Sequence, residues 1–181
     1  MEFLWISSFG SNSLYGARLR WLAMGLPWVA LLLGLALTPL RRISGQAWPI
    51  RFRRLVGLYA FFYACLHLLA YAWFDMEFSL PAVVDDVIKR PFILVGFLGW
   101  LLLLALAATS FNRAIRAMGA ARWQLLHKAV YVIAGLGVLH FFWMRAGKQL
   151  FGEVAIYAAI LGALLGWRLW RRLSVRARVP A

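Results

Sequence analysis

Residues 55–74 read LVGLYAFFYACLHLLAYAWF, a run of twenty residues in which His67 is the only side chain that titrates near neutral pH. A helix needs about 20 predominantly apolar residues to cross the hydrocarbon core of a bilayer, so this run predicts a membrane-spanning helix. A histidine inside such a helix is costly unless it has a partner, and it is therefore a candidate functional residue. The chain has two further histidines, His127 and His140, at the edge of and within another apolar run.

The whole chain is more apolar than a soluble domain. Of its 181 residues, 64% are hydrophobic and 14% are charged, whereas about a quarter of a typical soluble domain is charged. We therefore predict an all-α, polytopic transmembrane helix bundle, a single domain over residues 1–181 with no soluble domain. The five apolar runs lie near residues 22–40, 55–74, 92–111, 128–144 and 154–170.

Prolines and one short segment add local detail to this prediction. Pro91 stands at the favoured first-turn position of the third run. Pro27 is expected to kink the first run or to mark its start, and Pro39 fits its end. Residues 78–88 mix apolar and acidic side chains, a pattern that fits a short helix at the outer membrane interface.

The net positive charge lies on one side of the predicted bundle. The loops after the first and third runs and the C-terminal tail carry fourteen Lys or Arg and no acid, whereas the rest of the chain is neutral overall. The positive-inside rule places the basic side in the cytoplasm, with the N-terminus outside and the C-terminus inside. Topology and attraction to anionic membrane lipid therefore explain the net charge of +14 without nucleic acid. The fourteen basic residues of these three regions are Arg41, Arg42, Arg51, Arg53, Arg54, Arg113, Arg116, Arg122, Lys128, Arg168, Arg171, Arg172, Arg176 and Arg178.

His67 and His140 are predicted to face each other. The second and fourth runs both cross from the cytoplasmic to the outer side, so their helices are parallel, and both histidines fall in the outer half. Two imidazoles at one level across a bundle are what axial ligation of a haem iron from both sides requires. Ala64 and Gly137, one turn away, are small enough to let a porphyrin approach the backbone. The alternative is that each histidine only forms a hydrogen bond between helices.

His127 has a different position. It lies beside Lys128 at the cytoplasmic end of its run, roughly 20 Å from His140 along an ideal helix and on another face. The residue at its level on the second run is Arg54 rather than a histidine. The sequence leaves open whether His127 binds a second haem, shares one, binds a quinone or flavin, or is a solvated residue. Individual arginines on this side could likewise contact haem propionates, a flavin phosphate or a cytosolic electron donor.

Four stretches of the chain resemble a known family. They are TPLRR (38–42), RRLVGLYAFFYACLHLLAY (53–71), KRPFILVGFLGWLLLLALAATS (89–110) and RWQLLHKAVYVIAGLGVLHFFW (122–143). They are similar to the MsrQ (YedZ) family, the haem-binding membrane subunits of bacterial methionine sulfoxide reductase systems. That family belongs to the ferric-reductase-like transmembrane superfamily. Its members usually have six transmembrane helices, whereas five are counted here, and the missing one is the first.

The resemblance implies a function. His67, His127 and His140 match the haem-linked histidines of the family, and the haem is of the b type. Electrons pass from the quinone pool or a cytosolic flavin reductase to MsrP, a periplasmic molybdenum-containing methionine sulfoxide reductase that repairs oxidised envelope proteins. The chain would then be an electron-transfer subunit in the bacterial inner membrane rather than a catalyst on its own. FMN is also implied, although no residue identifies a flavin site.

Two other functions fit parts of the sequence. A stand-alone ferric or cupric reductase of the same superfamily normally requires an FAD/NADPH domain, and no such soluble module is evident in this chain. A non-haem structural or transport bundle would use its histidines only for hydrogen bonds between helices.

Overall fold

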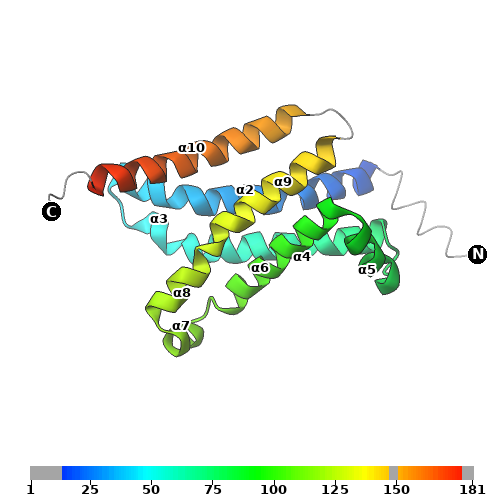
Figure 1. Ribbon diagram of the computed structural model, residues 1–181, viewed down its shortest axis with the longest axis horizontal. Helices are drawn as coiled ribbons and strands as arrows, with labels where there is room; N and C mark the ends of the chain where they lie inside the picture. Colours follow the sequence, from blue (N-terminus) through cyan, green and yellow to red (C-terminus); the bar gives the residue numbers. More distant parts are fainter. Residues whose placement is uncertain (1–13, 147–150, 177–181) are drawn as a thin grey trace, which may run out of the picture.

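A computed structural model describes residues 14–146 and 151–176 of the chain, and these residues form helices and no strand, which confirms the all-α prediction (Figure 1). In chain order the helices are α2 (Leu14–Ser44), α3 (Trp48–Arg51), α4 (Arg53–Phe74), α5 (Leu80–Lys89), α6 (Pro91–Ala108), α7 (Asn112–Met118), α8 (Ala120–His127), α9 (Ala129–Ala146) and α10 (Phe151–Arg176).

Five segments of the described chain are long and apolar enough to cross a membrane, which confirms the predicted number and order of the spanning runs. They are Gly25–Ser44, Arg53–Phe74, Pro91–Ala108, Ala120–Ala146 and Phe151–Ser174. The chain is therefore a multi-pass membrane protein. The fourth segment begins at Ala120 rather than near residue 128, because α8 leads into α9 with only Lys128 between them.

Pro39 was expected at the end of the first helix, and this prediction is wrong. α2 is continuous through Pro27 and Pro39 and ends only at Ser44. A proline inside a helix lacks the N–H that would bond the carbonyl four residues earlier. In α2 that carbonyl belongs to Leu35, and it accepts a hydrogen bond from the Arg168 guanidinium of α10 instead. The helix therefore continues past Pro39 with this carbonyl satisfied from another element.

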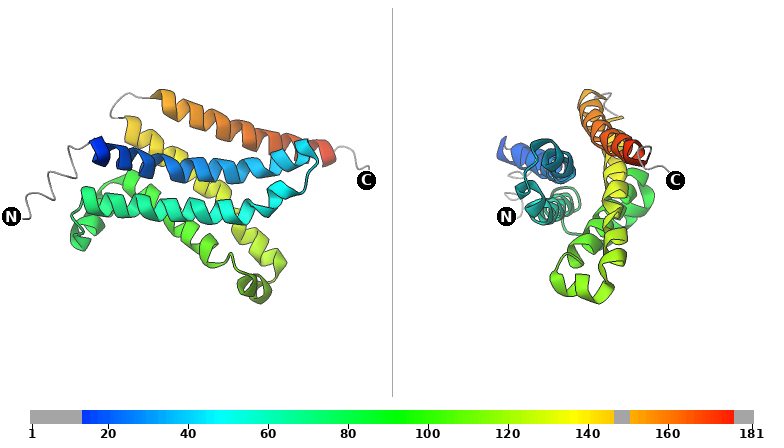
Figure 2. Two further views of the ribbon diagram at one scale, coloured as in Figure 1. Left: turned by 180° about the vertical axis from the view of Figure 1, so that it is seen from behind. Right: turned by 90° about the vertical axis from the view of Figure 1, so that its left-hand side faces the viewer.

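The spanning helices pack as two antiparallel pairs. α2 lies along α4, and α6 lies along α9, while α10 covers α9 and α2 (Figures 1 and 2). α4 also packs against α6, which joins the two pairs. As a result α4 and α9 run in the same direction, as predicted from the sequence (Figure 1).

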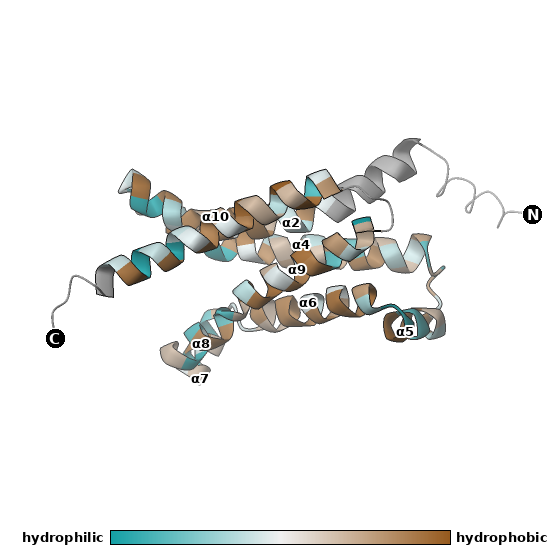
Figure 3. Ribbon diagram, turned by 45° about the horizontal axis from the view of Figure 1, so that its top comes forward, coloured by the Kyte–Doolittle hydropathy of each residue, from teal (hydrophilic) through white to brown (hydrophobic). Residues whose placement is uncertain are grey.

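The buried centre of the bundle is small. It contains Leu32 and Leu35 of α2, Ala134 of α9 and Leu161 of α10. Many large apolar side chains point outward instead, among them Phe62 with 52% and Ile156 with 61% of its surface exposed. Such exposure is unusual for a soluble monomer. It fits contact with lipid, and apolar residues follow the spanning segments while polar ones gather toward the ends of the bundle (Figure 3).

The two ends of the bundle differ in charge. The basic segments, at the end of α2, in α3, at the start of α4, in α7 and α8 and at the end of α10, all lie at one end (Figure 1). α5 lies at the other end and confirms the predicted short helix over residues 78–88. It begins where Ser79 caps the helix, because the Ser79 hydroxyl accepts a hydrogen bond from the Ala82 N–H at 3.4 Å.

Candidate cofactor site between α4 and α9

The imidazole rings of His67 and His140 lie next to each other between α4 and α9. Their centroids are 6.3 Å apart and their planes cross at 80°. Each histidine lies in the half of its helix that is nearer the α5 end of the bundle (Figure 1). The structure thus brings together the two histidines that the sequence pairs.

A backbone carbonyl of α6 orients the His140 ring. The Nδ1 atom of His140 is 2.6 Å from the carbonyl oxygen of Phe92. A carbonyl can only accept a hydrogen bond, so Nδ1 carries the proton and donates it. The Nε2 atom of His140 is then unprotonated and has a lone pair available for a metal.

Gly96 is what lets the His140 ring reach this carbonyl. A Cβ atom at position 96 would lie 2.7 Å from Nδ1 and 2.8 Å from Cε1 of His140, closer than side chains pack. In a helix the Cβ atom points back toward the preceding turn, and residue 96 is one turn after Phe92. Any other residue here would cover the Phe92 carbonyl. The sequence analysis did not single out Gly96; the signal was a small residue in a Leu-rich spanning helix, which marks close approach between helices.

The two small residues proposed to flank a porphyrin have different environments. Ala64 is buried on α4, one turn before His67. Gly137 faces Trp28 of α2, because a Cβ atom there would lie 2.8 Å from Cζ2 of the indole. The prediction for Gly137 is therefore wrong: the glycine makes room for Trp28, which also stacks on Tyr157 of α10 with ring centroids 6.2 Å apart.

His127 is separate from this pair, as the sequence predicts. It ends α8, where its ring stacks on Trp123 at a centroid distance of 4.0 Å and its Nε2 atom is 3.2 Å from the Thr109 hydroxyl. That hydroxyl donates its one proton to the Ala105 carbonyl at 2.7 Å. The Nε2 atom of His127 is then the donor to Thr109, which leaves Nδ1 unprotonated. The unprotonated ring nitrogen is thus Nδ1 in His127 and Nε2 in His140.

The turn before α8 makes this contact of His127 with α6 feasible. Gly119 has a φ of 78°, a conformation that favours glycine, and the chain reverses there between α7 and α8. The indole of Trp123 then donates a hydrogen bond to the Thr109 carbonyl at 2.8 Å. His127 and Trp123 thus both bind Thr109 at the end of α6, His127 through the hydroxyl and Trp123 through the carbonyl.

A buried carboxylate at the α5 end of the bundle contacts the helix that carries His67. The Asp86 side chain is 8% exposed, and it accepts a hydrogen bond from the Tyr71 hydroxyl at 2.7 Å. Its other oxygen pairs with Nε of Arg90 at 2.7 Å. Tyr71 is one turn beyond His67 on α4, so this contact ties α5 to the helix that carries the histidine. Asp86 belongs to the segment 78–88 that was expected at the outer interface, and the mixture of apolar and acidic residues there was the signal for its inward face.

The helices and the histidine pair define the class of protein. Residues 19–138, which include α4, α6, His67 and His127 and end two residues before His140, match the family described as ferric reductase like transmembrane component. No solved structure matches the chain.

Curated relatives define the family more closely. A protein-methionine-sulfoxide reductase heme-binding subunit MsrQ from Polaromonas naphthalenivorans is 61% identical over 80% of this chain and 69% of its own length. Proteins of the same name from Ralstonia nicotianae and Azospira oryzae are 46% and 45% identical over 94% and 98% of this chain, and over 80% and 75% of their own lengths. The chain belongs to the MsrQ family.

Proposed function

We propose that the chain is a transmembrane electron-transfer subunit that binds a b-type haem, with His67 and His140 as the two axial ligands. The observation that carries this proposal is the 6.3 Å separation of the two imidazole rings across the space between α4 and α9. The relatives whose name includes the words heme-binding subunit support the same cofactor.

The two rings are spaced as a shared metal would require. A metal–imidazole bond is about 2 Å long, so a metal bound by two facing imidazoles separates their centroids by roughly 6 Å. Among residues 14–146 and 151–176, no group of three or more His, Cys, Asp or Glu side chains could hold a metal ion alone. A metal between His67 and His140 would therefore take its other ligands from a macrocycle, and a porphyrin supplies them.

The protein prepares the two ligands in different ways. The Phe92 carbonyl fixes the tautomer of His140 and raises its basicity, the usual role of an outer hydrogen bond to a ligating histidine. His67 lies among apolar residues of α4, which keeps water from the site. A bound haem supplies a one-electron couple, and the axial histidines and the apolar surroundings tune its potential.

The direction of transfer follows from the proposed orientation. The basic end of the bundle lies in the cytoplasm and the α5 end in the periplasm of the bacterial inner membrane. The histidine pair is then nearer the side on which MsrP, the methionine sulfoxide reductase of the system, accepts electrons. The donor is the quinone pool or a cytosolic flavin reductase at the basic end. FMN binding rests on the family resemblance alone.

His127 is proposed to act at the entry side. Its unprotonated Nδ1 atom could ligate a second haem or accept a hydrogen bond from a quinone or flavin. The Thr109 hydroxyl and the Trp123 ring fix the orientation of its imidazole for either role.

Substitution of each histidine tests the ligand assignment. We expect His67→Ala and His140→Ala to abolish most of the low-spin haem signal in a reduced-minus-oxidised spectrum, because each removes an axial ligand. His127→Ala serves as the matched control. It should keep the signal of the haem bound by His67 and His140 while slowing reduction by the donor. Normal spectra in both single variants, or loss of all haem in His127→Ala, would contradict the assignment.

A second experiment separates the electron acceptors. The reduced protein should be reoxidised by MsrP with a methionine sulfoxide substrate much faster than by a ferric chelate. Faster reoxidation by the chelate would favour a ferric reductase, and a colourless protein after expression with adequate haem would favour a structural bundle.

A further inference from the structure

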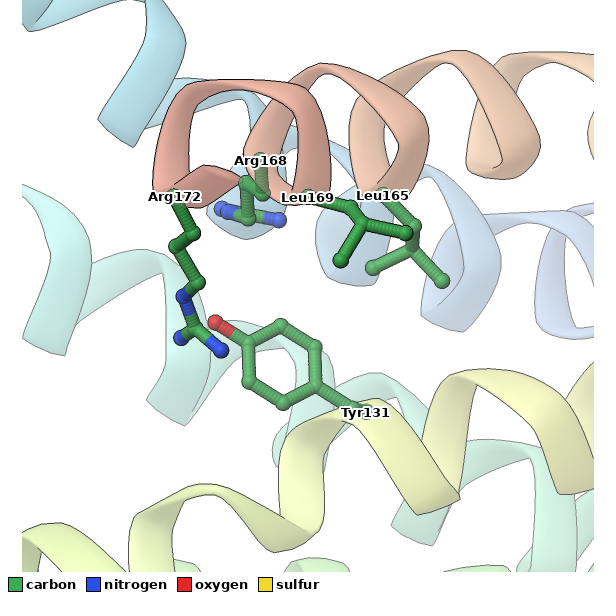
Figure 4. A pocket seen from close by; sticks show the side chains of 5 residues that line it. All are labelled: Tyr131, Leu165, Arg168, Leu169 and Arg172. Atoms are coloured by element: carbon green, nitrogen blue, oxygen red, sulfur yellow. The ribbon is translucent and has the colours of Figure 1, made fainter. Parts of the chain in front are cut away.

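We propose that a cavity between α9 and α10, at the basic end of the bundle, is a binding site for a phosphate-bearing anion (Figure 4). The cavity has a volume of about 140 Å³ and is lined by Tyr131 of α9 and by Leu165, Arg168, Leu169 and Arg172 of α10. It is separate from the histidine pair, because Tyr131 lies in the first half of α9 and His140 in the second half.

Arg168 is built into the bundle rather than placed on its surface. One of its guanidinium nitrogens, Nη2, donates to the Leu35 carbonyl that Pro39 leaves without its helical partner. Its Cζ atom lies 5.6 Å from the centre of the Tyr131 ring, within the range of a cation–π contact. These two contacts fix the guanidinium at the wall of the cavity.

The other terminal nitrogen of Arg168 lacks a hydrogen-bond acceptor among the described residues. Nη1 is buried and has no hydrogen-bond partner within residues 14–146 and 151–176. A buried donor without an acceptor is destabilising, and more so when it belongs to a charged group. An acceptor in the cavity would remove this cost.

The surroundings of Arg168 are positive. Arg172 lines the same cavity (Figure 4). Arg53 of α4 is close enough to add to the repulsion. The ion pairs formed in the described part of the chain all lie elsewhere, toward the α5 end: Lys89–Asp85, Arg90–Asp86 and Arg145–Glu153. The cavity therefore brings two guanidinium groups together without a carboxylate partner among the described residues, and a bound anion would balance their charge.

The size of the cavity limits the ligand. A volume of about 140 Å³ is below the roughly 300–1,000 Å³ of sites for drug-sized ligands, so a whole flavin or porphyrin does not fit. A phosphate group does fit, and its oxygens match the fork of guanidinium donors. The group could belong to an anionic lipid of the surrounding leaflet or to free phosphate, which share this chemistry.

Thermal stability of the purified protein in detergent tests the site without depending on haem. The protein is titrated with phosphatidylglycerol, with phosphatidylcholine and with inorganic phosphate. We expect phosphatidylglycerol or inorganic phosphate to raise the Tm of the parent protein and phosphatidylcholine to have little effect. Arg168→Gln and Arg172→Gln should each lose more than half of this shift. Arg168→Lys, which keeps the charge without the fork, should lose part of it.

Arg116→Gln is the matched control, because Arg116 is exposed on α7 at the same basic end and does not line the cavity. It should keep the full shift. Arg172 is also exposed, so Arg172→Gln keeps the test decisive if Arg168→Gln does not fold. A shift produced by phosphatidylglycerol alone identifies a lipid, and one produced by inorganic phosphate identifies the free anion. No shift with either probe, a full shift in both cavity variants, or an equal loss in Arg116→Gln would overturn the proposal.

Discussion

His140 is positioned by two features of one helical turn of α6, the carbonyl of Phe92 and the missing side chain of Gly96. We expect Gly96→Ala to push the imidazole off the carbonyl, because the new methyl carbon would lie 2.7 Å from Nδ1. The cost of such overpacking is about 1–3 kcal/mol. The haem content and the Tm of the purified protein should both fall.

Gly99→Ala is the control for this substitution. Gly99 lies on the same helix, and a Cβ atom there meets nothing within 4 Å. It should therefore keep the haem content and the Tm of the parent. Equal haem content in the two variants would show that contact with Gly96 does not position His140.

A second prediction about a single residue concerns Gly137. Gly137→Ala should lower the Tm, since the new methyl carbon would lie 2.8 Å from the Trp28 ring and would disturb its stacking on Tyr157. Gly135→Ala on the same helix, with nothing within 4 Å of its Cβ position, should leave the Tm unchanged. A Tm for Gly137→Ala as high as that of Gly135→Ala would contradict this account.

Helix α5 is attached to the bundle through one buried carboxylate. We expect Asp86→Asn to weaken the docking of α5, because it removes the ion pair with Arg90 and the charge-assisted bond from Tyr71. Hydrogen bonds to charged groups contribute about 1.5–3 kcal/mol each. Hydrogen–deuterium exchange of the α5 amides should therefore become faster.

The neighbouring Asp85 provides the control, since its ion pair with Lys89 is exposed and spans one helical turn. Such pairs contribute less than about 1 kcal/mol. Asp85→Asn should leave the exchange of α5 nearly unchanged. If both variants exchange at the same rate as the parent, Asp86 does not hold the helix.

The sequence predicts elements in this protein better than it predicts contacts. Hydropathy alone places five spanning runs, because a fixed bilayer thickness sets the length of each one. Charge and direction then put His67 and His140 at one level. The sequence cannot show which helix faces Gly137 or that Arg168 satisfies the carbonyl freed by Pro39. Both depend on how α2, α9 and α10 rotate against one another, and packing decides this rather than periodicity.

The proposed orientation of the whole molecule can be checked by chemical labelling in cells. Cys65 is first replaced by alanine, so that single cysteines can be placed at two exposed positions. We expect Lys89→Cys, at the C-terminal end of α5, to react with a membrane-impermeant maleimide in intact cells whose outer membrane is permeable to it. Arg116→Cys, at the basic end, should react only after the inner membrane is opened. The reverse pattern would invert the assigned direction of electron flow.

The confinement of positive charge to one end has an energetic consequence in a living cell. The inner membrane is negative inside, and each elementary charge moved across it costs about 2.3 kcal/mol per 100 mV. The three basic segments carry fourteen such charges, so with the basic end in the cytoplasm, as proposed, turning the inserted protein over would cost tens of kcal/mol against the membrane potential alone. The membrane potential therefore stabilises the proposed orientation relative to the inverted one.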